Sequence, residues 1–431
     1  MQFRNAGFSI GVIPVKVVNV SLNAFPRTGE IREHRADTRL LFYSHDGVGL
    51  GHVRRNLAIA SAVVQADPGA AVLVATSADE IFELDVPPAV DVLKLPGLRK
   101  IGNDNYASRH LRMAPAQVKA VRAAVLEAAV ASFMPTVLVA DKHPLGLGGE
   151  LVGALRALRA TGARAALGLR DILDDRRRVR EEWSERDLPR HISELYDRVL
   201  VYGDPAIFDP VHEYDLPPEV GSLTRFCGYV CGPVRAERSE RRRAEDARPL
   251  VVATAGGGMD GFAVLRTFIA AAATMPWQAV VVSGRQASEL ARATLRAEAA
   301  EAGVRFRTFL PRLASWLPDV DALVCMGGYN TLVEAMTAGL PTVCVPRVHP
   351  RQEQLIRARG FGQLGLLRTV EPCDLTAGTL RAEIVNALST PRDRLRARAR
   401  AALPLEGARA AAEELLELHE HAGSSLVGAR T

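Results

Sequence analysis

The feature that most constrains the fold is a regular alternation of short apolar segments with segments of helical periodicity. From Arg39 onward the apolar segments read RLLFYS, AAVLVATS, VDVLKLP, TVLVAD, ARAALGLR and RVLVYG. Each is bounded by polar, Gly or Pro residues and is apolar at successive positions, which is typical of parallel strands covered by helices on both faces. Ala- and Leu-rich segments of high helix propensity lie between them. The pattern predicts an α/β fold with a doubly wound parallel sheet.

The alternation lapses and then restarts near residue 240. The segment CGPVRAERSERRRAEDARP is charged and lacks apolar periodicity, which favours a linker. After it come LVVATAGGG, QAVVVSG, VRFRTFL, ALVCMGG and PTVCVPR, again separated by helical patterns. A chain of 431 residues is long enough for two domains of ordinary size. We expect a loose N-terminal extension (1–37), a first doubly wound domain (38–230), a linker (231–248), a second doubly wound domain (249–390), and a C-terminal helix and tail (391–431).

Composition narrows the class of protein. A hydrophobic content of 48% with 24% charged residues is that of a globular chain, and the net charge of +5 is spread along the sequence. We therefore expect no nucleic-acid partner. The five cysteines form no paired framework, which indicates a reducing, cytoplasmic compartment. No apolar stretch approaches the ~20 residues of a membrane span, so membrane contact, if any, would be peripheral at the inner face.

Ligands of doubly wound sheets bind beyond the carboxyl ends of the strands. At one such end the segment ATAGGGMDGF places Gly256, Gly257 and Gly258 between a strand and a helix. Backbone amides at a helix start suit a diphosphate, although a tight turn explains three glycines equally well. The segment is neither GxGxxG nor GK[ST], which argues against a dinucleotide-dependent oxidoreductase and against a P-loop.

The segment VCMGGYNTLVEAMTAGLP is more specific. Gly327 and Gly328 end a buried strand, and Asn330 and Thr331 begin a helix. One turn later comes Glu334, whose carboxylate can accept hydrogen bonds from two adjacent sugar hydroxyls while the helix start holds a phosphate. Favourable charge near a helix start is the alternative role for this glutamate.

A run of polar side chains follows the next strand in PRVHPRQEQLIRARG. Hydrogen-bond donors and acceptors gathered at a strand end are suited to reading sugar hydroxyls. The residues are His349, Arg351, Gln352, Glu353 and Gln354.

These segments resemble the GT-B glycosyltransferases, and most of all the MurG-like type of family 28. The resemblance extends from about residue 39 to residue 400 and is strongest over 322–360. It implies two Rossmann-like domains facing across a cleft, the first binding the acceptor and the second binding a nucleotide-diphosphate sugar, most commonly a UDP-sugar. It also implies a metal-independent reaction with no cofactor beyond the substrate, in keeping with a lone DxD motif at 319–321 for which helix capping suffices.

The resemblance assigns roles in the second domain. Glu334 matches the residue that binds the ribose, and Glu353 and Gln354 match a pair that contacts the donor sugar. The backbone near Leu310 would read the base, and Arg235 matches an arginine near the diphosphate. The family has two glutamines where this chain has a Glu–Gln pair, so the donor sugar is open, and the glycines of the first loop are also spaced differently.

The first domain opens with HDGVGLGHVRRNLAIA at 45–60. Its alternating glycines allow close approach of a ligand to the backbone, and His52 stands at the start of the following helix. Histidine is suited to take a proton from an attacking hydroxyl, and a helix N-terminus would lower its pKa and favour the neutral, basic form. We predict His52 as the general base, with a structural role at the helix start as the alternative.

Other strand ends at the same edge also carry polar residues. Asp141 in LVADKHPLG is the second candidate base, although an aspartate there is as often a turn residue. Asp171 follows a further strand in LGLRDIL. The residues predicted to bind the acceptor are His45, Asp46, Gly51, His143 and Arg170.

The sequence thus predicts an inverting glycosyltransferase that uses a nucleotide-diphosphate sugar. Two alternatives stay open, namely a sugar-nucleotide 2-epimerase on the same two-domain plan and a binding protein without chemistry. The acceptor is equally open between a lipid-linked molecule and a small metabolite.

Overall fold

The computed structural model describes residues 37–44, 50–100, 106–234, 248–310 and 313–427. Three predicted site residues, His45, Asp46 and Arg235, lie outside the described residues, as do nearly all of the predicted N-terminal extension and most of the predicted linker. Within the described ranges, no helix combines the length and the apolar character needed to cross a bilayer.

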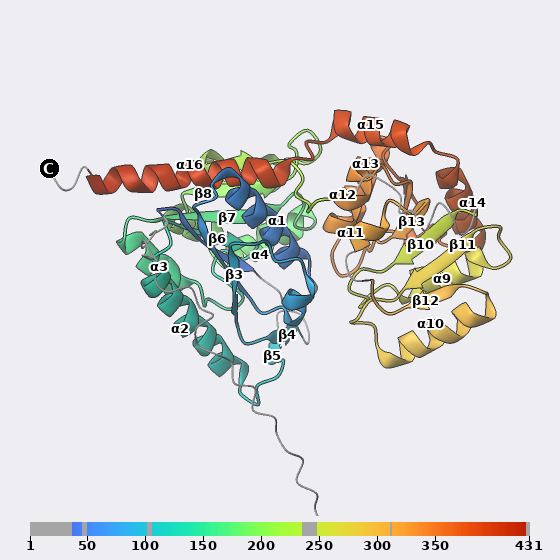
Figure 1. Cartoon of the computed structure of the whole chain (residues 1–431), viewed down its shortest axis with the longest axis horizontal. Coiled ribbons are helices and arrows are strands. Elements are labelled where there is room, and N and C mark those ends of the chain that lie inside the picture. The colour runs from blue at the N-terminus through green and yellow to red at the C-terminus, as the bar shows by residue number, and fades with distance from the viewer. Residues whose placement is uncertain (1–36, 45–49, 101–105, 235–247, 311–312, 428–431) are drawn as a thin grey trace, which may run out of the picture. The chain divides into compact units, whose positions relative to one another are not determined.

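The first part of the described chain forms a sheet of seven parallel strands (Figure 1). All six apolar segments predicted as strands are present, and a short seventh strand, β9, follows them. The order across the sheet is β3 (Val90–Lys94), β2 (Ala71–Thr76), β1 (Arg39–Ser44), β6 (Val137–Asp141), β7 (Arg164–Arg170), β8 (Arg198–Tyr202) and β9 (Thr224–Phe226). A separate antiparallel pair is formed by β4 (Leu98–Lys100) and β5 (Tyr106–Ser108).

Helices cover both faces of this sheet because successive strand residues point to opposite sides. Leu40 and Phe42 of β1 pack in one core with α1 (Gly51–Ala66), and Leu41 and Tyr43 pack in another with α2 (Pro115–Phe133) and α3 (Val152–Ala160). The remaining helices of this part are η2 (Asp79–Glu83), α4 (Arg176–Glu185), α5 (Leu188–Leu195), α6 (Pro210–Glu213) and α7 (Pro218–Leu223).

The second part of the described chain forms a sheet of six parallel strands, and all five predicted apolar segments contribute. The order is β12 (Arg305–Arg307), β11 (Gln278–Val282), β10 (Leu250–Thr254), β13 (Ala322–Cys325), β14 (Thr342–Cys344) and β15 (Arg368–Thr369). The helices are α9 (Phe262–Ala272), α10 (Glu289–Glu301), α11 (Leu313–Trp316), α12 (Tyr329–Thr337), α13 (Glu353–Gln363), η3 (Pro372–Asp374) and α14 (Ala377–Leu388). The predicted α/β class with two parallel, doubly wound sheets is confirmed.

The C-terminal stretch, predicted to be helical from about residue 391 to residue 421, forms two helices, α15 (Arg392–Ala402) and α16 (Gly407–Val427). The break includes Pro404, whose ring cannot continue a helix. Helix α16 returns to the first sheet and packs along α1 (Figure 1). Its buried stripe consists of Ala411, Leu415, Leu418 and Ala422, at the spacing of one helix face.

Two chain segments run side by side where the polypeptide passes between the sheets. Tyr229 N donates to the Pro404 carbonyl at 2.7 Å, and Gly407 N donates to the Tyr229 carbonyl at 3.1 Å. A Cβ at Gly407 would lie 2.6 Å from the Gly228 carbonyl oxygen, so this close approach requires a glycine.

Candidate active site

The two candidate bases contact one another. His52 is the second residue of α1, directly after the loop that follows β1, and Asp141 ends the neighbouring strand β6. His52 Nδ1 lies 2.9 Å from Asp141 Oδ2, with the histidine side chain 12% exposed and the aspartate fully buried. Because the carboxyl ends of parallel strands share one edge of the sheet, two residues 89 positions apart form a single site.

A third residue, which the sequence did not single out, completes this cluster. Arg55 lies one helical turn after His52, and its Nη2 donates to Asp141 Oδ1 at 2.7 Å and to Oδ2 at 2.8 Å. Its guanidinium also lies over the rings of Tyr202 and Tyr329, at 5.0 and 5.5 Å from the ring centroids. The i, i+3 spacing of a histidine and an arginine on a largely apolar helix was the available signal.

Two neighbours of His52 Nδ1 act on the histidine tautomer. Burial raises the pKa of the Asp141 carboxyl, but Arg55 and His52 outweigh it and hold that pKa below its usual range. An ionised carboxylate only accepts hydrogen bonds, so Asp141 favours the tautomer with the proton on Nδ1, whereas Arg55 Nη2, 3.0 Å from the same nitrogen, only donates and favours the other tautomer. In the tautomer that Asp141 favours, the basic lone pair of the ring is on Nε2.

Burial lowers the pKa of His52 to about 4, although Asp141 opposes the shift. The direction is the one predicted from sequence, but the dominant cause is removal from water and not the helix dipole. His52 is consequently neutral at physiological pH, the form that a general base requires.

The start of α12 contacts this cluster through α1. Asn330 Nδ2 donates to the Gly51 carbonyl at 3.0 Å, so a predicted donor residue and a predicted acceptor residue meet. Glu334 is buried and forms an ion pair with Arg54, the residue before Arg55. Glu334 Oε2 has no hydrogen-bond partner in the described part of the chain. Burial raises the pKa of Glu334, with Arg54 opposing the shift.

The polar run after β14 divides into three groups. Glu353 begins α13, pairs with Arg347 at 2.5 Å, and has a buried Oε2 that lacks a partner among the described residues. Gln354 Oε1 accepts from Arg347 N at 3.1 Å. By contrast, Gln352 N donates to Asp174 Oδ1 at 2.7 Å, and Arg351 also pairs with Asp174. His349 is exposed and stands apart from these two groups.

The remaining candidates lie around the same edge. Asp171 forms a bidentate ion pair with Arg357 of α13, and Arg357 also donates to the Gly327 carbonyl at 3.2 Å. Burial raises the pKa of Glu353, but Arg170 is close enough to help hold it below its usual range. His143 follows Lys142 after β6, and burial lowers its pKa well below the ordinary value.

The three glycines after β10 differ in their surroundings. Gly258 has φ +96°, and a Cβ there would lie 2.2 Å from the Ser283 carbonyl oxygen, so the turn itself requires this glycine. A Cβ on Gly257 would lie 2.8 Å from the end of the Gln286 side chain, whereas one on Gly256 would meet nothing within 4 Å. Thr331 is the third residue of α12, Gly328 caps that helix, and Leu310 packs in the hydrophobic core.

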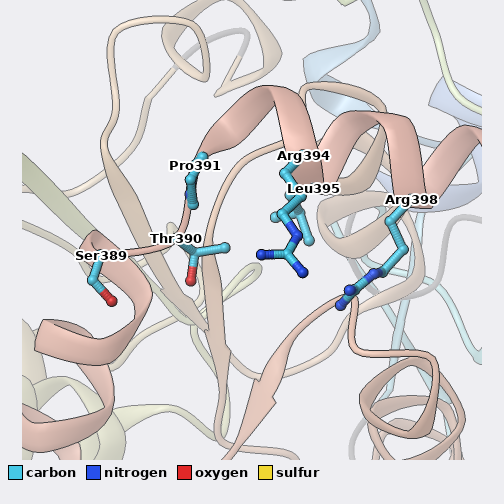
Figure 2. Close-up of a pocket in the computed structure, with 6 residues that line it drawn as sticks. All are labelled: Ser389, Thr390, Pro391, Arg394, Leu395 and Arg398. Atoms are coloured by element: carbon cyan, nitrogen blue, oxygen red, sulfur yellow. The ribbon is translucent and has the colours of Figure 1, made fainter.

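A pocket lies elsewhere, at the start of α15 (Figure 2). It is lined by Ser389, Thr390, Pro391, Arg394, Leu395 and Arg398, and none of these is a predicted site residue. The candidate active site is therefore defined by the contacts of His52, Asp141 and Arg55 and not by this pocket. Over the described ranges, no group of three or more His, Cys, Asp and Glu side chains is arranged to hold a metal ion.

Comparison with known proteins gives a family match for part of the chain and a fold for most of it. Residues 257–415 match the glycosyltransferase family 28 C-terminal domain. The crystal structure of a kitacinnamycin glycotransferase superposes with a TM-score of 0.60 at 18% identity, covering 88% of this chain and 98% of that one. MurG of Acinetobacter baumannii superposes with a TM-score of 0.56 at 14% identity, covering 88% and 99%. The chain has the GT-B fold, and its C-terminal part matches family 28.

Curated relatives of this chain include a UDP-N-acetylglucosamine–N-acetylmuramyl-(pentapeptide) pyrophosphoryl-undecaprenol N-acetylglucosamine transferase of Thiobacillus denitrificans. It is 29% identical over 216 residues, which are 49% of this chain and 57% of the relative. Demethyllactenocin mycarosyltransferase of Streptomyces fradiae is 29% identical over 195 residues, 43% of this chain and 39% of the relative. The chain thus matches about half the length of these relatives.

The family match covers one side of the candidate site. Residues 257–415 include Glu334, Glu353 and Gln354, whereas His52 and Asp141 precede the matched segment. The assignment of the base therefore rests on the geometry of the first sheet.

Proposed function

We propose that this chain is a glycosyltransferase that moves a sugar from a nucleotide-diphosphate sugar to an acceptor hydroxyl. The observation that carries the proposal is the contact of His52 Nδ1 with Asp141 Oδ2 at 2.9 Å, with Arg55 bound to the same carboxylate. A neutral imidazole with its proton held on Nδ1 presents Nε2 as a base, which is what an attacking hydroxyl requires.

The proposed reaction is a single displacement with inversion. His52 Nε2 takes the proton of the acceptor hydroxyl as its oxygen bonds to the anomeric carbon, and the bond to the diphosphate breaks on the opposite side. Asp141 stabilises the imidazolium that forms. The departing diphosphate takes the electron pair, and its charge is placed at the N-terminus of α12, without a metal ion or a cofactor.

Two buried carboxylates are the proposed contacts of the donor. Glu334 Oε2 and Glu353 Oε2 are acceptors without a partner among the described residues, so each would gain a hydrogen bond from a sugar hydroxyl. We assign Glu334 to the ribose and Glu353, with Gln354, to the transferred sugar. The backbone near Leu310 is proposed to read the base. Uridine is proposed because the N-acetylglucosamine transferase of Thiobacillus denitrificans is named for a UDP-sugar.

The names of the relatives favour transfer over the alternatives. Those reported above are transferases, which weighs against a 2-epimerase and against a binding protein without chemistry. One of them has a pyrophosphoryl-undecaprenol acceptor in its name and the other has demethyllactenocin. Both a lipid-linked acceptor and a small metabolite are therefore compatible with the proposal. We propose a cytoplasmic reaction, with peripheral membrane contact only for a lipid-linked acceptor.

A thermal-shift series with UDP, dTDP, ADP and NAD tests the donor class. A ligand at about 100 times its Kd adds about 2.7 kcal/mol to the free energy of unfolding, which raises Tm measurably. We expect a nucleoside diphosphate to raise Tm and NAD to leave it unchanged. Release of UDP from a UDP-sugar that requires an added acceptor would support transfer. Stabilisation by NAD alone, or release of a free epimerised sugar without an acceptor, would contradict the proposal.

A further inference from the structure

Within the described part of the chain, two cations at the candidate site, Lys142 and Arg170, lack the carboxylate partner that the arginines around them have. Lys142 follows Asp141 after β6, and Arg170 ends β7. Over the described residues, neither side chain has a hydrogen bond or an ion pair, and Arg170 Nε is buried without a partner. The arginines around them each pair with a carboxylate: Arg54 with Glu334, Arg55 with Asp141, Arg347 with Glu353, Arg351 with Asp174, and Arg357 with Asp171.

The backbone brings the two cations to one edge. β6 and β7 are adjacent, with Asp141 opposite Gly168, and Lys142 N donates to the Gly168 carbonyl at 2.8 Å. Arg170 is two residues beyond Gly168 on the same strand. Lys142 has φ +71°, a left-handed conformation that costs energy in a non-glycine residue and often marks a functional position.

The lowered pKa values of Lys142 and Arg170 agree with their placement at one edge of the sheet. Burial lowers the pKa of Lys142 to about 7, and Arg170 and Arg351 add to that shift while Asp141 and Glu353 oppose it. His52 and His143 are the other titratable groups that face Lys142. Burial also lowers the pKa of Arg170, with Glu353 opposing the shift. Two desolvated like charges destabilise one another, and an anion between them would relieve both.

We propose that Lys142 and Arg170 form a subsite for an oxyanion, a carboxylate or phosphoryl group, carried by the acceptor. This inference rests on the proposed function and narrows its substrate class. Arg170 ends β7 of the first sheet and Lys142 directly follows β6, so both adjoin the His52–Asp141 pair, where the attacking hydroxyl is placed. The diphosphate of the donor is assigned instead to the start of α12. The acceptor would therefore carry its negative charge near the hydroxyl that reacts.

Sulfate is a suitable probe because its charge does not change over the pH range used. Calorimetric titration of the full chain with sulfate at pH 6.5, with and without saturating UDP, measures the subsite directly. We expect sulfate to bind equally well in both conditions. Lys142→Met and Arg170→Met should each weaken sulfate binding at least about tenfold while changing the Kd of UDP less than twofold.

Two further variants control for charge and folding. Arg177→Gln removes a cation whose side chain is 87% exposed on α4, and it should leave sulfate binding unchanged. In the wild type, sulfate binding should weaken between pH 6.5 and pH 8.5 as Lys142 loses its proton. Lys142→Arg should bind sulfate throughout that range, because arginine stays charged.

The possible results distinguish a failure of the oxyanion subsite from a failure of the proposed function. Sulfate binding unchanged in both Met variants would overturn the subsite. Displacement of sulfate by UDP would assign the oxyanion to the diphosphate of the donor and overturn the acceptor assignment. A chain that binds sulfate through Lys142 and Arg170 but binds no nucleotide would support an oxyanion subsite and contradict the proposed function.

Discussion

Arg55 Nη2 donates to both carboxylate oxygens of Asp141, and neither side chain is more than 1% exposed. The ion pair keeps Asp141 charged at a position where burial alone would favour the neutral acid. A charged Asp141 in turn favours the His52 tautomer that carries its proton on Nδ1. The basicity of the imidazole thus depends on an arginine that the substrate does not need to contact.

Asp141→Asn should destabilise the fold as well as the reaction. Without the carboxylate, Arg55 becomes a buried charge that lacks a counter-ion, and we expect the free energy of unfolding to fall by about 3–5 kcal/mol. Urea denaturation measures this. The same substitution at Asp215, whose side chain is 47% exposed and pairs with Arg176, should lower the free energy of unfolding by less than about 1 kcal/mol. Equal losses at the two positions would show that the buried pair has no special role.

The lowered pKa of His52 predicts an acid-sensitive stability. In the unfolded chain His52 titrates near its usual 6.5 and in the folded chain at about 4, so between these values the unfolded state binds more protons. Stability should therefore fall as the pH drops from about 6.5 to about 4, with His52 contributing up to about 3 kcal/mol.

His143 and Asp141 also have lowered pKa values, and they too make the fold less stable as the pH drops. The contribution of His52 is therefore measured by comparing the wild type with a variant that lacks this histidine. Between pH 7 and pH 4.5 the wild type should lose about 2 kcal/mol more stability than His52→Asn. Denaturation at the two pH values gives the comparison. Equal losses in the two proteins would show that His52 titrates normally in the folded chain.

Glu334→Gln tests the ribose contact. A hydrogen bond to a charged group contributes about 1.5–3 kcal/mol, so the Kd of UDP should rise roughly 10- to 100-fold. The Kd of 2′,3′-dideoxy-UDP, which lacks the hydroxyls, should be the same for wild type and variant. Titration calorimetry measures both, and Glu406→Gln, at an exposed ion pair, is the matched control. A variant that loses affinity for both nucleotides equally would place the ribose elsewhere.

The glycines after β10 predict two different effects of alanine. At Gly258 the new Cβ would overlap the Ser283 carbonyl at 2.2 Å, and unfolding should become easier by more than about 3 kcal/mol. At Gly256, where the space is open, only the strain of φ +62° applies, about 1 kcal/mol. Chemical denaturation of both variants measures the two losses in the free energy of unfolding. The reverse order would mean that the turn is not packed as described.

The fold was largely predictable because strands buried on both faces leave continuous apolar runs, as in RLLFYS and ALVCMGG. The position of α16 could not be predicted from the sequence. Its pattern shows which face is buried, with Leu415 and Leu418 on it, but an amphipathic pattern does not identify the partner. The short strands β9 and β15 were also missed, since two or three residues carry too little periodicity.

For the site, the rule that ligands bind at the carboxyl ends of strands selected His52, Asp141 and Glu334, and the structure places these residues on elements that contact one another. The sequence could not show that His52 and Asp141 form one unit, because their contact joins residues from two strands. It also missed Arg55 and Lys142. Their proposed roles are inferred from burial and from the pairing of nearby charges, which only a folded chain defines.

The most direct test of the central claim is the rate of sugar transfer by His52→Asn at saturating donor. If His52 is the base, kcat should fall about 100- to 10,000-fold while the Kd of UDP changes less than twofold. A variant that keeps a tenth or more of the wild-type kcat, with its nucleotide affinity intact, would contradict that assignment.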